Sequence, residues 1–127
     1  MDSYVIDASA FLAIIRDEVG AETAVARLPG SAMSTVNASE ALMRGVEKGF
    51  PLHLMHEFLS SQQVRIIAFD EELAIAAALL RPTTKRAGLS FADRVSIATA
   101  IKLDATVVTA DRVWAELDLP CKVELIR

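Results

Sequence analysis

Short apolar segments alternate with longer helical patterns along the chain, and this alternation restricts the possible folds more than any other feature. Five short segments have the apolar and β-branched residues typical of strands, at 4–6, 32–34, 64–69, 106–108 and 123–126. Helical patterns fill the intervals, at 8–16, 21–28, 36–48, 52–60, 71–80, 90–103 and 111–117. Segment 81–88, which contains Pro82 and several polar residues, is predicted to be a loop. We therefore expect an α/β protein with a mainly parallel sheet of about five short strands and helices on both faces.

The composition is that of one compact domain spanning residues 1–127. Apolar residues make up 53% of the chain and aromatic residues only 6%, so the core is expected to consist mainly of alanine, valine, leucine and isoleucine. No secretory signal is recognised, and the longest plain apolar run, 74–80, is too short to cross a bilayer. The single cysteine, Cys121, can form no internal disulfide. We therefore expect a cytoplasmic protein without a membrane segment, in which Cys121 is an ordinary core thiol.

The net charge bears on possible partners. Thirteen lysine and arginine residues against seventeen aspartate and glutamate residues give a formal net charge of −4. This balance argues against a protein that coats nucleic acid, because such proteins are basic. It is compatible with an enzyme whose carboxylates hold a cation, since the cation then meets the phosphate of the substrate.

Four acidic residues are placed where they could meet. Asp7 directly follows the first strand, and Asp111 follows the fourth. In parallel α/β sheets, functional sites form outside the carboxyl ends of the strands. Asp93 lies in the first turn of helix 90–103 and shares a face with its apolar residues, while Glu40 lies in the early turns of helix 36–48. We therefore expect these four acids to gather at one edge of the sheet.

Four carboxylates in one place need a counter-charge. They would repel one another and raise their own pKa values, and an ionised carboxylate on an inward face is costly unless it is paired. A hard divalent cation resolves the conflict, because Mg²⁺ and Mn²⁺ prefer oxygen ligands. No cysteine or histidine belongs to the set, which disfavours zinc. The pattern predicts a Mg²⁺ or Mn²⁺ site.

Each acid also has a purely structural interpretation. Asp7 could cap the helix that follows it, and Asp111 could stabilise the N-terminus of the next helix. Ser90 and Asp93 have the spacing of a capping box, and so do Asn37 and Glu40. These interpretations explain the acids one at a time. Their shared position at the sheet edge favours the cation site.

Other polar residues are predicted to have ordinary roles. His53 and His56, followed by Glu57, depart from the H-E-x-x-H order of zinc proteases and are expected on a helix surface. Trp114 is expected to pack in the core rather than to stack on a base. Asp70 begins the run Asp-Glu-Glu that opens helix 71–80, where it should act as a cap and complement the helix dipole.

Four segments carry a family resemblance. They read VIDASA at 5–10, NASE at 37–40, GLSFADR continuing to IATA within 88–100, and VVTADR at 107–112. Together the segments resemble those of PIN-domain ribonucleases, and in particular the VapC-like toxins of type II toxin–antitoxin systems. Their order and spacing match over essentially the whole chain, so the resemblance implies a single PIN-like domain with a three-layer α/β/α fold. It also implies metal-binding and catalytic roles for the four acids, with the Ser9 and Thr109 hydroxyls orienting them as supporting groups.

The resemblance implies a function and partners. The expected activity is that of a Mg²⁺- or Mn²⁺-dependent endoribonuclease, which hydrolyses RNA phosphodiester bonds at the four acids as the toxin of a toxin–antitoxin pair. The expected partners are RNA, a small antitoxin and a second copy of the chain in a homodimer. Basic residues flank the acidic segments and could contact RNA phosphates, although each could equally be a solvated surface residue. They are Lys85, Arg86, Arg94 and Arg112.

Two other functions remain open from the residues alone. One is an interaction module without turnover, against which the complete set of acids argues. The other is a metal-dependent phosphatase, because a strand ending in Val-Ile-Asp also suits a phosphoryl acceptor. Phosphatases of that class usually have a second aspartate two residues further on, where this chain has Ser9.

Overall fold

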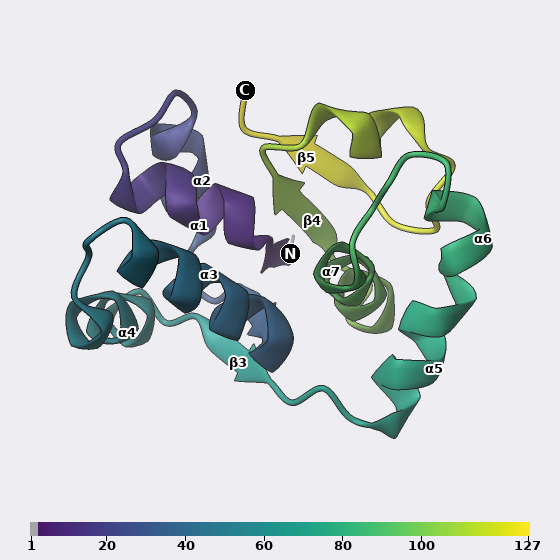
Figure 1. Cartoon of the computed structure of the whole chain (residues 1–127), viewed down its shortest axis with the longest axis horizontal. Helices are drawn as coiled ribbons and strands as arrows, with labels where there is room; N and C mark the ends of the chain where they lie inside the picture. Colours follow the sequence, from purple (N-terminus) through teal and green to yellow (C-terminus); the bar gives the residue numbers. More distant parts are fainter. Residues whose placement is uncertain (1–2) are drawn as a thin grey trace.

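The sheet confirms the predicted parallel arrangement. The computed structural model describes residues 3–127 (Figure 1). Its five strands lie in the order β3-β2-β1-β4-β5, with every neighbouring pair parallel. The strands are β1 (Tyr4–Ile6), β2 (Ala32–Ser34), β3 (Arg65–Ile67), β4 (Thr106–Thr109) and β5 (Val123–Leu125). From central β1 the chain builds outward on one side through β2 and β3, and then crosses to the other side for β4 and β5. The connections therefore diverge between β1 and β4, which is where such sheets leave a crevice for a ligand.

Helices fill the connections between the strands. They are α1 (Ala8–Ile15), α2 (Ala21–Arg27), α3 (Thr35–Glu47), α4 (Leu52–Ser61), α5 (Glu71–Leu79), α6 (Arg81–Thr84), α7 (Phe91–Lys102) and a 3₁₀ helix, η1 (Arg112–Glu116). The prediction of an uninterrupted loop over 81–88 is wrong, because α6 occupies its first half. Pro82 is tolerated there because it lies at the start of the helix, where a missing N–H breaks no helical bond. Within residues 3–127, no helix is long and apolar enough to cross a membrane.

The central strands are buried on both faces, as their apolar sequences predict. Alternate residues point in opposite directions, so Ile6 and Val108 contribute to one apolar core and Val5 and Val107 to the other. The first core packs against helices that include α1, α3 and α4, and the second against α5 and α7. Helices on both faces give the three layers expected of the chain. Strands held this firmly fix the positions of the residues that follow their carboxyl ends.

The residues predicted to have ordinary structural roles behave as expected. His53 and His56 are exposed on α4, and Trp114 is buried in the core. Asp70 caps α5, where its carboxylate accepts a hydrogen bond of 2.9 Å from the backbone N–H of Leu73. Cys121 is half-buried at the border of the second core, and burial raises the pKa of its thiol.

Candidate metal centre

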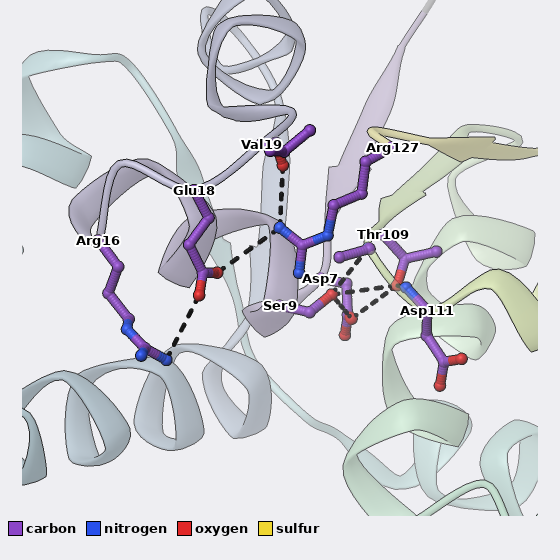
Figure 2. Close-up of polar contacts among 9 residues, drawn as sticks. Asp7, Ser9, Arg16, Glu18, Val19, Thr109, Asp111 and Arg127 are labelled. Atoms are coloured by element: carbon purple, nitrogen blue, oxygen red, sulfur yellow. Dashed lines mark hydrogen bonds and ion pairs between the residues drawn. The ribbon is translucent and has the colours of Figure 1, made fainter.

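Asp7 lies between β1 and α1, where its carboxylate turns toward β4. Its backbone is at the N-cap position of α1, but its side chain makes no capping bond, so its interpretation as a helix cap is wrong. The Oδ2 atom instead accepts hydrogen bonds from the hydroxyls of Ser9, at 2.7 Å, and Thr109, at 3.0 Å (Figure 2). The structure thus places both predicted supporting hydroxyls on the same carboxylate oxygen.

The two hydroxyls are themselves held by the chain that leaves β4. Ser9 Oγ accepts a hydrogen bond of 3.0 Å from the N–H of Ala110, and Thr109 Oγ1 accepts one of 3.1 Å from the N–H of Asp111. Each hydroxyl accepts a hydrogen bond from a backbone N–H and donates its own proton to Asp7. The connection after β1 is therefore joined to the connection after β4 by a small network around one carboxylate (Figure 2).

The second oxygen of Asp7 has no partner within residues 3–127. The residue is only 3% exposed, and its Oδ1 atom is buried without a hydrogen bond. Burial raises the pKa of Asp7 to about 6, and the nearby charges of Asp93 and Glu40 add to the rise, whereas the two hydroxyl bonds oppose it. A buried, unpaired carboxylate oxygen in an acidic neighbourhood is a position that a divalent cation would fill.

The other acids lie within electrostatic range of Asp7 or of one another. Burial raises the pKa of Glu40 first, followed by the charge of Asp93. Burial also raises the pKa of Asp93, with a further contribution from the charge of Asp111. Asp111 is exposed at the start of η1. The structure therefore brings all four predicted acids to the carboxyl edge of the sheet.

Two of the acids, Asp93 and Asp111, each cap a helix and also belong to the site. Asp93 Oδ2 accepts a bond of 2.9 Å from the N–H of Ser90, whose hydroxyl accepts a bond of 3.2 Å from the N–H of Asp93, so the predicted capping box is present. Asp111 Oδ1 accepts a bond of 3.1 Å from the N–H of Val113 at the start of η1. Each cap engages one carboxylate oxygen and fixes the direction of the side chain, which leaves the other oxygen for a ligand.

Glu40 takes no part in a capping box. The N-cap of α3 is Ser34, which ends β2 and accepts a hydrogen bond of 3.0 Å from the N–H of Asn37. The predicted capping box of Asn37 and Glu40 is therefore wrong, because the capping residue is Ser34, one helical turn before Asn37. Glu40 is left half-buried, with its carboxylate free of a capping role.

The four acids do not form a closed cage. Across residues 3–127, no three acidic, histidine or cysteine side chains stand close enough together to hold one metal ion between them. Mg²⁺ rarely uses such cages in phosphate-handling enzymes, where it keeps several waters and binds through one or two carboxylates together with the substrate phosphate. An all-oxygen set with one buried unpaired oxygen therefore fits Mg²⁺ or Mn²⁺ in a site that remains open to a substrate.

The four predicted basic residues do not pair with the acids in the described part of the chain. Lys85 and Arg86 are exposed after α6, and Arg94 is half-buried on α7. Arg112 donates a hydrogen bond of 3.0 Å to the backbone oxygen of Arg127. In the described part of the chain, none of the four predicted basic residues forms a hydrogen bond or ion pair with the four acids.

Two arginines that the sequence interpretation missed lie near the acids. Arg44 is one helical turn beyond Glu40 on α3, and its charge lowers the pKa values of Glu40 and Asp93. The sequence signal for this pair is its i, i+4 spacing, which places Glu40 and Arg44 on the same face of a helix. Arg127 donates a bond of 2.9 Å to the oxygen of Val19 and lies 3.6 Å from Glu18 beside the site (Figure 2). No local pattern indicates that contact, because its partners are more than a hundred residues apart.

Comparisons with known proteins agree with the fold. A family model of the PIN domain matches residues 4–119. Comparison with curated protein sequences finds no significant match. Similar solved structures include a toxin–antitoxin complex from Klebsiella pneumoniae, with a TM-score of 0.76 and 18% identity over 98% of both chains.

Two further solved structures are similar over most of the chain. VapBC2 from Rickettsia felis, bound to a DNA fragment from its promoter, has a TM-score of 0.72 and 20% identity, over 97% of this chain and 98% of that one. VapC20 from Mycobacterium tuberculosis, a sarcin–ricin loop cleaving toxin, has a TM-score of 0.74 and 18% identity, over 89% and 93% of the respective chains. At these identities the likeness shows a shared fold.

Proposed function

Because the chain belongs to the PIN domain family, we propose that it is a divalent-metal-dependent endoribonuclease and the toxin of a toxin–antitoxin pair. The observation that carries the proposal is the Asp7 carboxylate, which is buried with one oxygen unpaired and lies near three further acids. The similar structures lend support, since one is a toxin described as cleaving the sarcin–ricin loop and others are toxin–antitoxin complexes.

The proposed mechanism is direct hydrolysis. The four acids would hold Mg²⁺ or Mn²⁺, which when bound supplies a Lewis acid and lowers the pKa of a coordinated water. Ser9 and Thr109 hold the carboxylate of Asp7 in one direction, and the caps of α7 and η1 do the same for Asp93 and Asp111. Within residues 3–127 no serine or cysteine forms a hydrogen bond with a histidine side chain, so a water would attack phosphorus directly, and the phosphorus–oxygen bond to the leaving ribose oxygen would break without a covalent protein intermediate.

The proposed partners follow from the same site. An RNA backbone would reach the carboxyl edge of the sheet, with phosphate contacts from Lys85, Arg86, Arg94 or Arg112 on its flanks. A small antitoxin would silence the site with a basic side chain, which supplies the positive charge that the acids otherwise take from a cation. We expect the toxin to be a homodimer and to act in the cytoplasm, where RNA is available.

The alternatives are separated by one assay. Purified protein is incubated with structured RNAs and Mg²⁺ or Mn²⁺, alongside Asp7→Asn and Asp93→Asn, with the exposed Asp118→Asn as the matched control. We expect cleavage by the wild type and by Asp118→Asn, and a loss of at least about 100-fold in both site variants, because even supporting residues of metal sites contribute about 10- to 100-fold. Cleavage that survives both site substitutions would refute the site.

A different pattern of activity would favour another function. Phosphatase activity without RNA cleavage would favour the phosphatase. Ser9 speaks against it, because the side chain two residues after Asp7 donates a hydrogen bond to Asp7 rather than offering a second carboxylate. The absence of both activities, with the protein folded and loaded with cation, would favour a module that only binds a partner.

A further inference from the structure

Asn37 is a buried polar residue that the proposed mechanism does not use. It lies in the first turn of α3, its exposed fraction is 1%, and it is among the largest fully buried side chains of the protein. A side-chain amide offers two N–H donors and an acceptor oxygen, and burying it is costly unless these groups are bonded. Its hydrogen bonds therefore indicate why an amide is present at this position.

Both ends of the amide are engaged. Its Nδ2 atom donates a hydrogen bond of 2.8 Å to the backbone oxygen of Ala92, the residue immediately before Asp93. Its Oδ1 atom accepts a bond from the hydroxyl of Ser34, which also accepts the backbone N–H of Asn37. The side chain thus joins the end of β2 and the start of α3 to the start of α7.

The same face of α3 carries the acid that meets α7. Glu40 lies three residues beyond Asn37 and Arg44 seven, so the three side chains form one stripe along the helix. The stripe faces α7, because Asn37 contacts Ala92 there, the charge of Asp93 raises the pKa of Glu40, and the charge of Arg44 lowers the pKa of Asp93. The Asn37–Ala92 bond is therefore one turn from Glu40 on α3 and directly next to Asp93 on α7.

We propose that Asn37 is a positioning residue, which fixes the distance between Glu40 and Asp93 and so sets the affinity of the acidic site for a divalent cation. Only the expected effect of Asn37 on RNA cleavage rests on the proposed function. Its effect on cation affinity can be measured without any RNA. Asn37 thus has a role beyond stability, because the two helices it joins each carry one acid of the site.

The substitutions closest to asparagine in size lose these bonds. Aspartate would keep an acceptor for Ser34 but would lose the donor to Ala92 and add a fifth negative charge near the acids. Leucine has a similar volume but neither donor nor acceptor, which leaves the Ser34 hydroxyl and the Ala92 carbonyl without their present partner. Alanine removes the bridge and introduces no charge, so Asn37→Ala is the cleanest test.

A purely structural role makes a different prediction, and a matched variant separates the two. Thr99 is also fully buried, and its hydroxyl donates a bond of 2.7 Å to the backbone oxygen of Val95 within α7, but it does not touch α3 through that bond. Thr99→Val removes a buried hydrogen bond of the same helix without breaking the bridge to α3. If Asn37 only stabilises the fold, the two variants should differ in stability alone.

The experiment measures Mn²⁺ binding by following free Mn²⁺ with electron paramagnetic resonance, at a pH of about 7.5 and a temperature at which circular dichroism shows each protein folded. We expect Asn37→Ala to raise the dissociation constant about 10- to 100-fold, the range typical of residues that orient metal ligands, and Thr99→Val to leave it within about 2-fold. Ser34→Ala, which removes the other anchor of the amide, should change it in the same direction, and it carries the test if Asn37→Ala does not fold.

The readout also separates this inference from the proposed function. In RNA cleavage, excess Mn²⁺ should restore the rate of Asn37→Ala but not that of Glu40→Gln, because only the second loses a ligand. Wild-type affinity in folded Asn37→Ala, or in Ser34→Ala where that variant carries the test, would overturn the positioning role. So would a wild type that binds no Mn²⁺. A third outcome is that Asn37→Ala binds Mn²⁺ more weakly, as expected, but the wild type cleaves no RNA. That result would refute the nuclease proposal and leave the positioning role standing.

Discussion

Ionisation of Asp7 should make the cation-free protein less stable as the pH rises. Folding raises the pKa of Asp7 from its ordinary value of 3.8 to about 6, chiefly because the carboxyl is buried. Below both values the carboxyl is protonated in the folded and unfolded chains, and no difference arises. Between them the unfolded chain releases its proton first, so the unfolded state is increasingly favoured until the pH passes about 6.

The size of the effect follows from the same two values. Their difference corresponds to about 3 kcal/mol of unfolding free energy at neutral pH, of which about 2 kcal/mol is lost between about pH 4 and pH 7. The raised pKa values of Glu40 and Asp93 act in the same direction. The contribution of Asp7 alone, about 3 kcal/mol, is a large share of the unfolding free energy of a small domain.

Urea unfolding of the wild type and Asp7→Asn isolates the contribution of one residue. Both proteins are unfolded without divalent cations at several values from about pH 4 to pH 7.5, and the difference between their unfolding free energies is plotted against pH. The amide of the variant adds a constant offset, because it does not titrate. We expect the wild type to lose about 2 kcal/mol relative to Asp7→Asn over this interval.

Mn²⁺ should reverse the effect. A cation that binds only the folded state adds about 2.7 kcal/mol when its concentration is 100 times its dissociation constant, which offsets most of the cost of the ionised Asp7. Asp118→Asn should gain this stability as the wild type does, and Asp7→Asn should not. A difference between wild type and Asp7→Asn that is constant from about pH 4 to pH 7.5 would refute the assignment of a buried, destabilised carboxylate to Asp7.

Three further predictions concern the same edge of the sheet. Thr109→Val removes one of the hydrogen bonds that lower the pKa of Asp7, so we expect that pKa to rise further and Mn²⁺ affinity to fall about 10-fold in a titration, whereas unchanged affinity would speak against a supporting role. Arg44→Gln removes a charge that lowers the pKa values of Glu40 and Asp93, so the acid limb of the pH–rate profile should move to higher pH, and an unmoved limb would contradict this. In the wild type, Mn²⁺ binding followed by calorimetry should weaken as the pH falls through about 6, because protonated Asp7 is a poor ligand, and affinity that is constant down to about pH 5 would count against Asp7 as a ligand.

The acids at strand ends could be located from the sequence because their position depends on local order. Asp7 ends a buried apolar run, and Asp111 follows another, so the parallel topology alone brings them to one edge. The capping box of Ser90 and Asp93 is local as well, and it was predicted and is present. Caps and strand ends depend on residues only a few positions apart, which is why the pattern identified them.

Three features of the structure could not be predicted from the local sequence pattern: the cap of α3, the short helix α6 and the contact between α3 and α7. The sequence places the helix at 36–48, within one residue of α3, but it does not identify the cap, because Ser34 and Asn37 are both good capping residues and Ser34 also ends β2. The turn of α6 is not predicted because Pro82 and the polar residues around it are typical of a loop, although proline is also tolerated at the start of a helix. The bond from Asn37 to Ala92 spans 55 residues, and packing between two helices decides it.

The central claim is that the acids at the carboxyl edge hold a divalent cation beside Asp7. A crystal of the protein grown or soaked with Mn²⁺ tests it directly, because the anomalous signal of manganese locates the ion without reference to activity. We predict a manganese peak in contact with Oδ1 of Asp7, the oxygen that is buried without a hydrogen bond in residues 3–127. A peak elsewhere, or none in a crystal whose Ser9 and Thr109 hydroxyls still bond to Asp7, would contradict the account.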